Sequence, residues 1–134
     1  MLVKDLDNNN HNWQLTGNMS KGSLENKSSY HLKARELLTG LFPTLQILEE
    51  VPIPLRRSET LFLDFYLPLK KLCLEIHGEQ HYKFVAFYHS NMLGFLKAQK
   101  RDKEKQEWCS INNIQFIELP YDESIDDWRK RIQS

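Results

Sequence analysis

Residues 61–82, LFLDFYLPLKKLCLEIHGEQHY, decide the fold of this chain. Two apolar runs, residues 61–67 and 72–77, flank the short turn Pro-Leu-Lys-Lys. A connection this short joins antiparallel strands, so the stretch predicts a β-hairpin. Asp64 lies in the first run and Glu75 in the second, at similar distances from the turn. We therefore expect the two acids to be cross-strand neighbours.

Two acids inside apolar strands need an explanation, because a desolvated charge requires a compensating partner. Neighbouring carboxylates repel each other unless one is protonated or a cation lies between them. Carboxylate oxygens together with a backbone carbonyl are the ligands that Mg²⁺ and Mn²⁺ prefer. The pair predicts a metal-dependent hydrolytic site. The alternative is that one acid faces solvent on an edge strand.

Two histidines follow the second acid. His77 comes two residues after Glu75, so the strand pleat points both side chains to one face. An imidazole with a pKa of ~6.5 can orient or deprotonate a water molecule. The alternative is a structural histidine at the end of a strand, and His81 then only lines the following loop. Together the histidines also allow a zinc site, although no cysteine pair or third histidine has suitable spacing nearby.

Outside this stretch, the 134 residues are consistent with one domain and an extension. Residues 1–27 are polar and aperiodic, which predicts a flexible extension with Trp13 docked on the domain or reaching a partner. Residues 28–134 form the domain. Its class is α/β with a mixed sheet, because the return from the third strand to the fourth needs a helical crossover. The remaining expected elements are helices at 28–41, 91–110 and from Ser124, and strands at 46–51 (ended by Pro52 and Pro54) and 114–119.

Composition limits the function classes. Charged residues form 27% of the chain, and 18 basic residues balance 18 acidic ones, which argues against a protein that coats nucleic acid. No apolar run approaches the ~20 residues of a membrane span. The N-terminus lacks a signal-peptide pattern, so we expect a cytoplasmic protein with free thiols at its two cysteines.

Basic residues gather on the helix expected at residues 91–110. Lys97, Arg101 and Lys105 recur every four residues and share a neighbourhood on the helix surface. They form either a phosphate-contacting face or an ordinary solvated face.

Three segments resemble the PD-(D/E)XK nuclease superfamily: FLDFYLP, LEIHGEQHY and KRDKEKQEWCSINNIQFIELPY. Within it, they are similar to the very-short-patch-repair-like branch and the EDxHD homing endonucleases. The resemblance covers most of the domain. It implies a restriction-endonuclease-like αβββαβ core, to which this chain adds a C-terminal helix.

The resemblance also implies roles for individual residues. Asp64 matches the central metal-binding acid, and Glu75 matches the acid of the (D/E)-x-K element, with the Ile76 carbonyl as a further metal ligand. Glu36 matches an acid that some branches supply from the first helix, and His81 resembles the downstream histidine of the repair-like branch. His77 is a departure, because it stands where the superfamily has a lysine.

The implied activity is that of a divalent-metal-dependent DNA endonuclease with Mg²⁺ or Mn²⁺, encoded by a phage or mobile element. One domain has one site, so cutting both strands requires a homodimer, a partner protein or two nicks. The alternative is a weak or inactive nuclease-fold subunit that binds nucleic acid within a larger assembly, which the zero net charge and missing lysine favour. The candidate DNA contacts are Lys97, Arg101, Lys105, Lys70 and Lys71.

Overall fold

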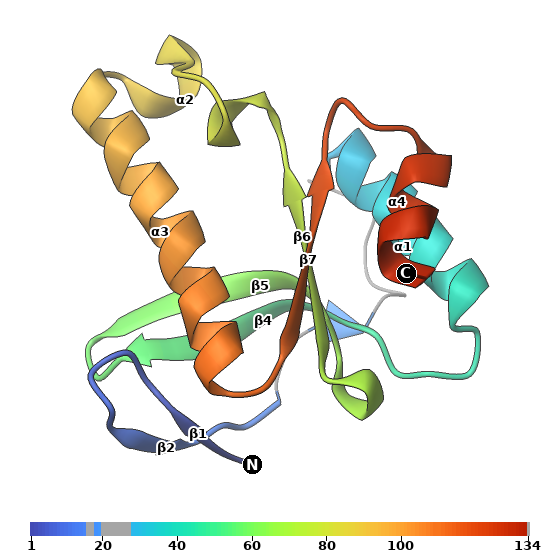
Figure 1. Ribbon diagram of the computed structural model, residues 1–134, viewed down its shortest axis with the longest axis horizontal. Helices are drawn as coiled ribbons and strands as arrows, with labels where there is room; N and C mark the ends of the chain where they lie inside the picture. Colours follow the sequence, from blue (N-terminus) through green and yellow to red (C-terminus); the bar gives the residue numbers. More distant parts are fainter. Residues whose placement is uncertain (16–17, 20–27, 134) are drawn as a thin grey trace.

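The computed structural model describes residues 1–15, 18–19 and 28–133 (Figure 1). It contains a two-stranded hairpin, a five-stranded sheet and four α-helices. The strands are β1 Leu2–Lys4, β2 Asn10–Asn12, β3 Asn18–Met19, β4 Leu48–Arg56, β5 Glu59–Leu67, β6 Leu72–His77 and β7 Gln115–Pro120. The helices are α1 Ser29–Leu41, α2 Ala86–His89, α3 Met92–Ile111 and α4 Ile125–Gln133, with 3₁₀ turns at Pro68–Lys70 and Glu79–His81.

The sheet has the order β3-β4-β5-β6-β7 and is antiparallel except for the parallel pair β6–β7. Helix α3 makes the crossover between these parallel strands and covers one face, whereas α1 and α4 cover the other (Figure 1). Trp108 anchors the core on the α3 side and Trp128 the core on the α1/α4 side. The predicted mixed α/β class and the C-terminal helix are confirmed.

Local signals explain where the elements begin. The Ser28 hydroxyl accepts a hydrogen bond from the His31 N–H at 3.1 Å and caps α1. The Asn91 side chain caps α3 through the Gly94 N–H, and Ser124 caps α4 through the Asp127 N–H. Strand β6 is apolar at most positions because helices cover both of its faces.

The prediction that Pro52 and Pro54 end the strand before them is wrong, because β4 runs through both to Arg56. Their carbonyls accept hydrogen bonds from the indoles of Trp13 (2.9 Å) and Trp108 (3.1 Å) rather than from β5. The N and C=O of a strand residue point to the same side, so the proline nitrogens face the edge of β4 that β5 does not use. A missing N–H costs nothing in the ladder there.

The prediction of a flexible extension over residues 1–27 is wrong for residues 1–13. These residues form the β1–β2 hairpin, and Val3 and Trp13 are only 2% and 4% exposed in the α3-side core. The Asp5 carboxylate holds the hairpin loop by accepting the N–H groups of Asp7 and Asn9. The docking of Trp13 is confirmed. Residues 16–17 and 20–27 lie outside the described part of the chain.

Candidate active site

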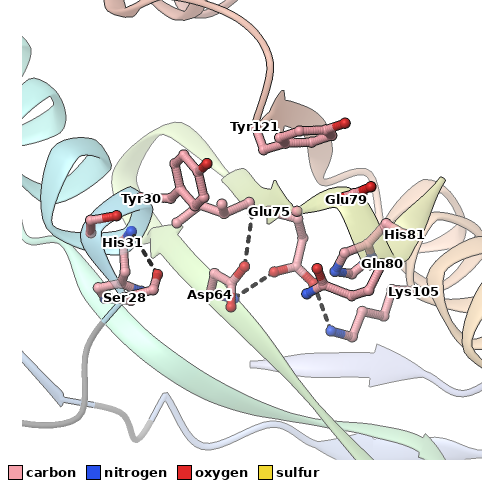
Figure 2. Close-up of a pocket in the computed structure, with 13 residues that line it drawn as sticks. Ser28, Tyr30, His31, Asp64, Glu75, Glu79, Gln80, His81, Lys105 and Tyr121 are labelled. Carbon is pink, nitrogen blue, oxygen red and sulfur yellow. Dashed lines mark hydrogen bonds and ion pairs between the residues drawn. The ribbon is translucent and has the colours of Figure 1, made fainter. Parts of the chain in front are cut away.

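Asp64 and Glu75 face each other across β5 and β6, as predicted. The backbone ladder between these strands runs from Leu67↔Leu72 to Phe65↔Leu74, so the next positions are Asp64 and Glu75. There the side chains bind the opposite backbone: Asp64 N–H donates to Glu75 Oε2 at 2.8 Å, and Ile76 N–H donates to Asp64 Oδ2 at 2.9 Å (Figure 2). At this point the two strands are joined by bonds from backbone N–H groups to carboxylates rather than to backbone carbonyls.

The Ile76 carbonyl also faces the acid pair. Backbone groups alternate in direction along a strand, and the His77 carbonyl accepts a hydrogen bond from Tyr121 on the β7 side. The Ile76 carbonyl therefore points the other way, toward β5, in the direction in which the Ile76 N–H meets Asp64. The Ile76 carbonyl thus points toward the strand that carries Asp64.

Strand β5 and its other neighbour, β4, have irregular backbones at the level of Asp64. Leu63 packs on the α3 side of the sheet and Phe65 on the α1/α4 side, although residues two apart on a regular strand share a face. The alternation therefore changes at Asp64. On β4, Glu50 occupies the neighbouring position with a φ of 53°, a left-handed conformation that is costly for a side chain with a Cβ. Irregular backbone concentrates at functional sites, so Glu50 is an acid of interest that the sequence did not reveal.

Lys105 of α3 reaches the pair from the α3 side of the sheet. Its Nζ lies 2.7 Å from Glu75 Oε1, and both side chains are largely buried. Burial and the nearby charge of Asp64 raise the pKa of Glu75 well above its ordinary value, and Lys105 only partly opposes them. Desolvation lowers the pKa of Lys105, but the attractions of Glu75, Asp64 and Asp102 together outweigh it, so this pKa is raised as well. One lysine is thus shared by two acids.

The acid pair lies at the base of a cavity of about 630 Å³ (Figure 2). The start of α1, the turn after β6, α3 and the residue after β7 form its walls. The lining residues are Ser28, Ser29, Tyr30, His31, Asp64, Glu75, Ile76, Gly78, Glu79, Gln80, His81, Lys105 and Tyr121.

Each of the two histidines is held by a carboxylate. His81 Nδ1 lies 2.7 Å from Asp102 Oδ2 on α3, and His77 Nδ1 lies 2.9 Å from Glu118 Oε1 on β7. His77 shares the α3 face with Glu75, as predicted, and burial with the nearby His81 lowers the pKa of His77. Of the two, His81 lines the cavity.

His77, His81 and Asp102 bring possible metal-ligand atoms within 4.8 Å of one another. The two imidazole rings, however, are stacked with 2° between their planes and 4.3 Å between their centroids. A ligated metal lies in the plane of each imidazole, and no point lies in both of two parallel, separated planes. The arrangement therefore fits two oriented imidazoles better than the zinc site that the sequence allowed.

The structure does not bring every candidate residue to the cavity. Glu36 is exposed on α1 and lines a separate depression with Ile125 and Arg129, whereas only the first turn of α1 reaches the cavity. Lys70 and Lys71 lie at the β5–β6 turn, where the Lys70 Nζ is 5.0 Å from the ring centroid of Phe42.

The other basic candidates lie on α3 outside the cavity wall. Lys97 and Arg101 are exposed, about two and about one helical turn before Lys105, respectively.

From α1, the cavity receives a histidine rather than an acid. His31 Nε2 lies 2.7 Å from Glu49 Oε1 on β4, and Arg35 donates to both oxygens of Glu49 at 2.8 Å. The side chain of Glu49 is fully buried. This network fixes the start of α1 against β4 and so positions the adjacent Tyr30 and Ser28 at the cavity. In the sequence, the only sign of this network is that His31 and Arg35 are polar residues on an otherwise apolar face of the helix.

Comparisons with known proteins give relatives but no family. No family model matches the chain, and no solved structure matches it. It is 44% identical over 59 residues to uncharacterized protein 307L of Invertebrate iridescent virus 6, covering 44% of this chain and 30% of that protein. It is 34% identical over 70 residues to uncharacterized protein 033L of Invertebrate iridescent virus 3, covering 52% and 36%.

A third relative is uncharacterized protein 094L of Frog virus 3, which is 37% identical over 65 residues, covering 48% of this chain and 42% of that protein. The chain thus spans less than half the length of each of these relatives. Within its described helices, none is long and apolar enough to cross a membrane.

Proposed function

We propose that this chain is a divalent-metal-dependent DNA endonuclease that hydrolyses phosphodiester bonds in the cavity above Asp64 and Glu75. The observation that supports this most is the pairing of these two carboxylates where β5 and β6 stop pairing, at the base of an open cavity. A structural ion pair needs one acid and one base, whereas here a second acid raises the cost of burial. The similarity to iridescent-virus proteins supports a viral origin, with the host-cell cytoplasm as the place of action.

The donor set suits a hard divalent cation. The carboxylates of Asp64 and Glu75 and the carbonyl of Ile76 are all oxygen ligands, and the carbonyl points toward the strand that carries Asp64. These residues would hold Mg²⁺ or Mn²⁺. A cation bound there polarises the scissile phosphate and lowers the pKa of a bound water.

Lys105 supplies the ammonium group that β6 lacks. His77 stands at the position where the resemblance implies a lysine, and the ammonium that reaches Glu75 comes instead from α3. A buried cation beside the reacting phosphate stabilises negative charge as it develops in the transition state. We assign that role to Lys105.

His81 is the proton-transfer residue in this proposal. Asp102 holds its Nδ1, which leaves Nε2 as the atom available to a water or a leaving oxygen. Lys97 and Arg101 extend a basic face along α3 away from the cavity, where they meet the DNA backbone on one side of the scissile bond.

The alternative function is a nucleic-acid-binding subunit without activity. One observation favours it: Lys105 already lies 2.7 Å from Glu75, so a positive charge at this acid is present without a metal ion. The zero net charge of the chain points the same way.

A plasmid-nicking assay with Mg²⁺ or Mn²⁺ separates these functions. The wild type is expected to nick supercoiled DNA, since one chain has one site. Asp64→Asn and Glu75→Gln, which change shape least, should each lower the rate by about 10³-fold, because a lost metal ligand removes several kcal/mol of transition-state stabilisation. Glu107→Gln, at an exposed glutamate of α3, is the matched control and should cleave like the wild type.

Two results would contradict the proposal. If the wild type leaves both the plasmid and single-stranded DNA intact with every metal tried, the binding-subunit alternative holds. If Asp64→Asn cleaves as fast as the wild type, any activity belongs to another site or to a contaminant.

A further inference from the structure

Two tyrosines line the same cavity as the acid pair. Tyr30 is the second residue of α1, and Tyr121 directly follows β7. The two tyrosines are thus far apart in the sequence but neighbours in space. Their ring centroids are 6.5 Å apart at an interplanar angle of 71°, and Tyr121 lies 6.1 Å from Tyr82 in turn. Figure 2 shows the rings of Tyr30 and Tyr121 beside and above the carboxylates of Asp64 and Glu75.

The fold itself makes little use of these rings. Tyr30 is 39% exposed, and neither Tyr30 nor Tyr121 belongs to the buried core on either side of the sheet. Aromatic faces left open in a polar cavity are available to a ligand with a flat, stackable ring. Nucleobases are such rings, and base–aromatic stacking occurs with all four bases.

The charges around the tyrosines are unfavourable for a continuous duplex. Glu79 lines the cavity, Tyr82 donates a hydrogen bond to Glu118, and Glu123, two residues beyond Tyr121, is paired with Arg131 at 2.6 Å. The lysines at this rim are already engaged, Lys105 with Glu75 and Lys83 with Glu79 at 4.0 Å. A duplex brings one phosphate charge per ~1.7 Å of axis and keeps its base faces stacked inside. Its phosphates would meet basic groups that already have acidic partners, and its bases would not reach the rings.

The size of the cavity supports a small ligand portion. About 630 Å³ lies within the ordinary range of pockets for small molecules, which is ~300–1,000 Å³. Such a space takes a nucleotide, with its base on a tyrosine and its phosphate toward the acids, but not the width of a double helix.

We propose that Tyr30 and Tyr121 form a base-stacking subsite and that the preferred substrate is unpaired DNA, such as a single strand or the splayed arm of a fork. As a statement about cleavage it rests on the proposed function. As a statement about binding it stands on the tyrosines, the rim charges and the cavity alone.

Binding to labelled oligonucleotides by fluorescence anisotropy tests the subsite, with Asp64→Asn present in every variant so that no strand is cut. The probes are a DNA single strand, the RNA of the same sequence, the blunt DNA duplex and a fork. We expect the single strand and the fork to bind more tightly than the duplex. Tyr30→Ala and Tyr121→Ala should each weaken binding by roughly 5- to 150-fold.

Three controls separate stacking from folding. Tyr30→Phe and Tyr121→Phe keep the ring and should bind within about twofold of the parent protein. Phe62→Ala removes an aromatic ring that is 54% exposed on β5 and does not line the cavity, and should change nothing. A 2-aminopurine base in the single strand reports stacking directly, because its fluorescence falls when it stacks.

The outcomes distinguish the two proposals. The subsite is overturned if the duplex binds as tightly as the single strand, or if both alanine variants bind like the parent. Plasmid nicking by the wild type would then leave the endonuclease proposal standing by itself. If the wild type cuts nothing but stacking and tyrosine dependence are observed, the subsite stands and the endonuclease proposal fails. Equal binding of the RNA supports the subsite, because stacking does not read the sugar.

Discussion

Glu49 and Glu75 are both buried strand glutamates held by a basic residue from a helix, yet their surroundings are opposite. Arg35 and His31 both bind the carboxylate of Glu49, whose side chain is fully buried. Glu75 has one lysine and faces a second acid, Asp64, at the base of a cavity. The first arrangement compensates a charge, whereas the second leaves excess negative charge beside solvent.

The difference distinguishes a buried acid that stabilises the fold from a buried acid that is a candidate for function, within one sheet. A buried acid with complementary partners fixes two elements together and does not require a ligand. A buried acid with a raised pKa, a like-charged neighbour and access to a cavity is unfavourable for folding alone, and such groups concentrate at functional sites. The contrast between Glu49 and Glu75 predicts opposite effects of neutralising the two centres.

The largest expected effect comes from Glu49→Gln. It removes the buried carboxylate charge to which Arg35 donates two hydrogen bonds, which should lower the free energy of unfolding by about 3–5 kcal/mol. Urea denaturation measures it, with Glu107→Gln as the exposed control, expected within about 0.5 kcal/mol of the wild type. A Glu49→Gln protein as stable as the wild type would remove the structural half of the comparison.

A smaller effect of opposite sign is expected from Asp64→Asn. The amide still accepts the Ile76 N–H but no longer repels Glu75, so the free energy of unfolding should rise by about 1 kcal/mol while cleavage is lost. Thermal unfolding measures the gain. Asp7→Asn is the control, because Asp7 makes only a 3.8 Å surface pair with Arg56. A loss of stability in Asp64→Asn would show that this acid is structural, like Glu49.

The smallest expected effect is on the pH dependence of stability. Because the folded pKa of Glu75 is raised, the native state holds this proton more tightly than the unfolded chain. Its contribution is therefore greatest near and below the ordinary value of 4.5 and is lost as the pH rises through the raised pKa. Asp64→Asn removes one cause of the raised pKa of Glu75. The variant should therefore lose less stability than the wild type as the pH rises, and the difference between its melting temperature and that of the wild type should grow between about pH 4 and pH 8. A constant difference would mean that the two acids do not interact.

Features set by local sequence were predictable. The short turn fixes the register of β5 against β6, so Asp64 opposite Glu75 and the bounds of β6 followed from counting residues. The helices expected at 28–41, 91–110 and from Ser124 are present as α1, α3 and α4, with bounds within about one residue of those expected.

Features that depend on packing between distant segments were not predictable. Helical spacing placed Lys105 on a face of α3, but only the crossover over the sheet brings it to Glu75. Glu36 and His31 both lie on α1, and the direction in which that helix packs decides which of them reaches the cavity. Trp13 follows a hairpin whose three-residue strands are too short to show a period.

The two indole bonds to the proline carbonyls have a consequence for association between molecules. An open strand edge invites pairing with another chain, and β4 has such an edge beyond its short contact with β3. Pro52 and Pro54 offer no N–H on that edge, and Trp13 and Trp108 occupy their carbonyls. The edge is closed to an incoming strand at these residues, so a dimer of this chain has to assemble through another surface of the molecule.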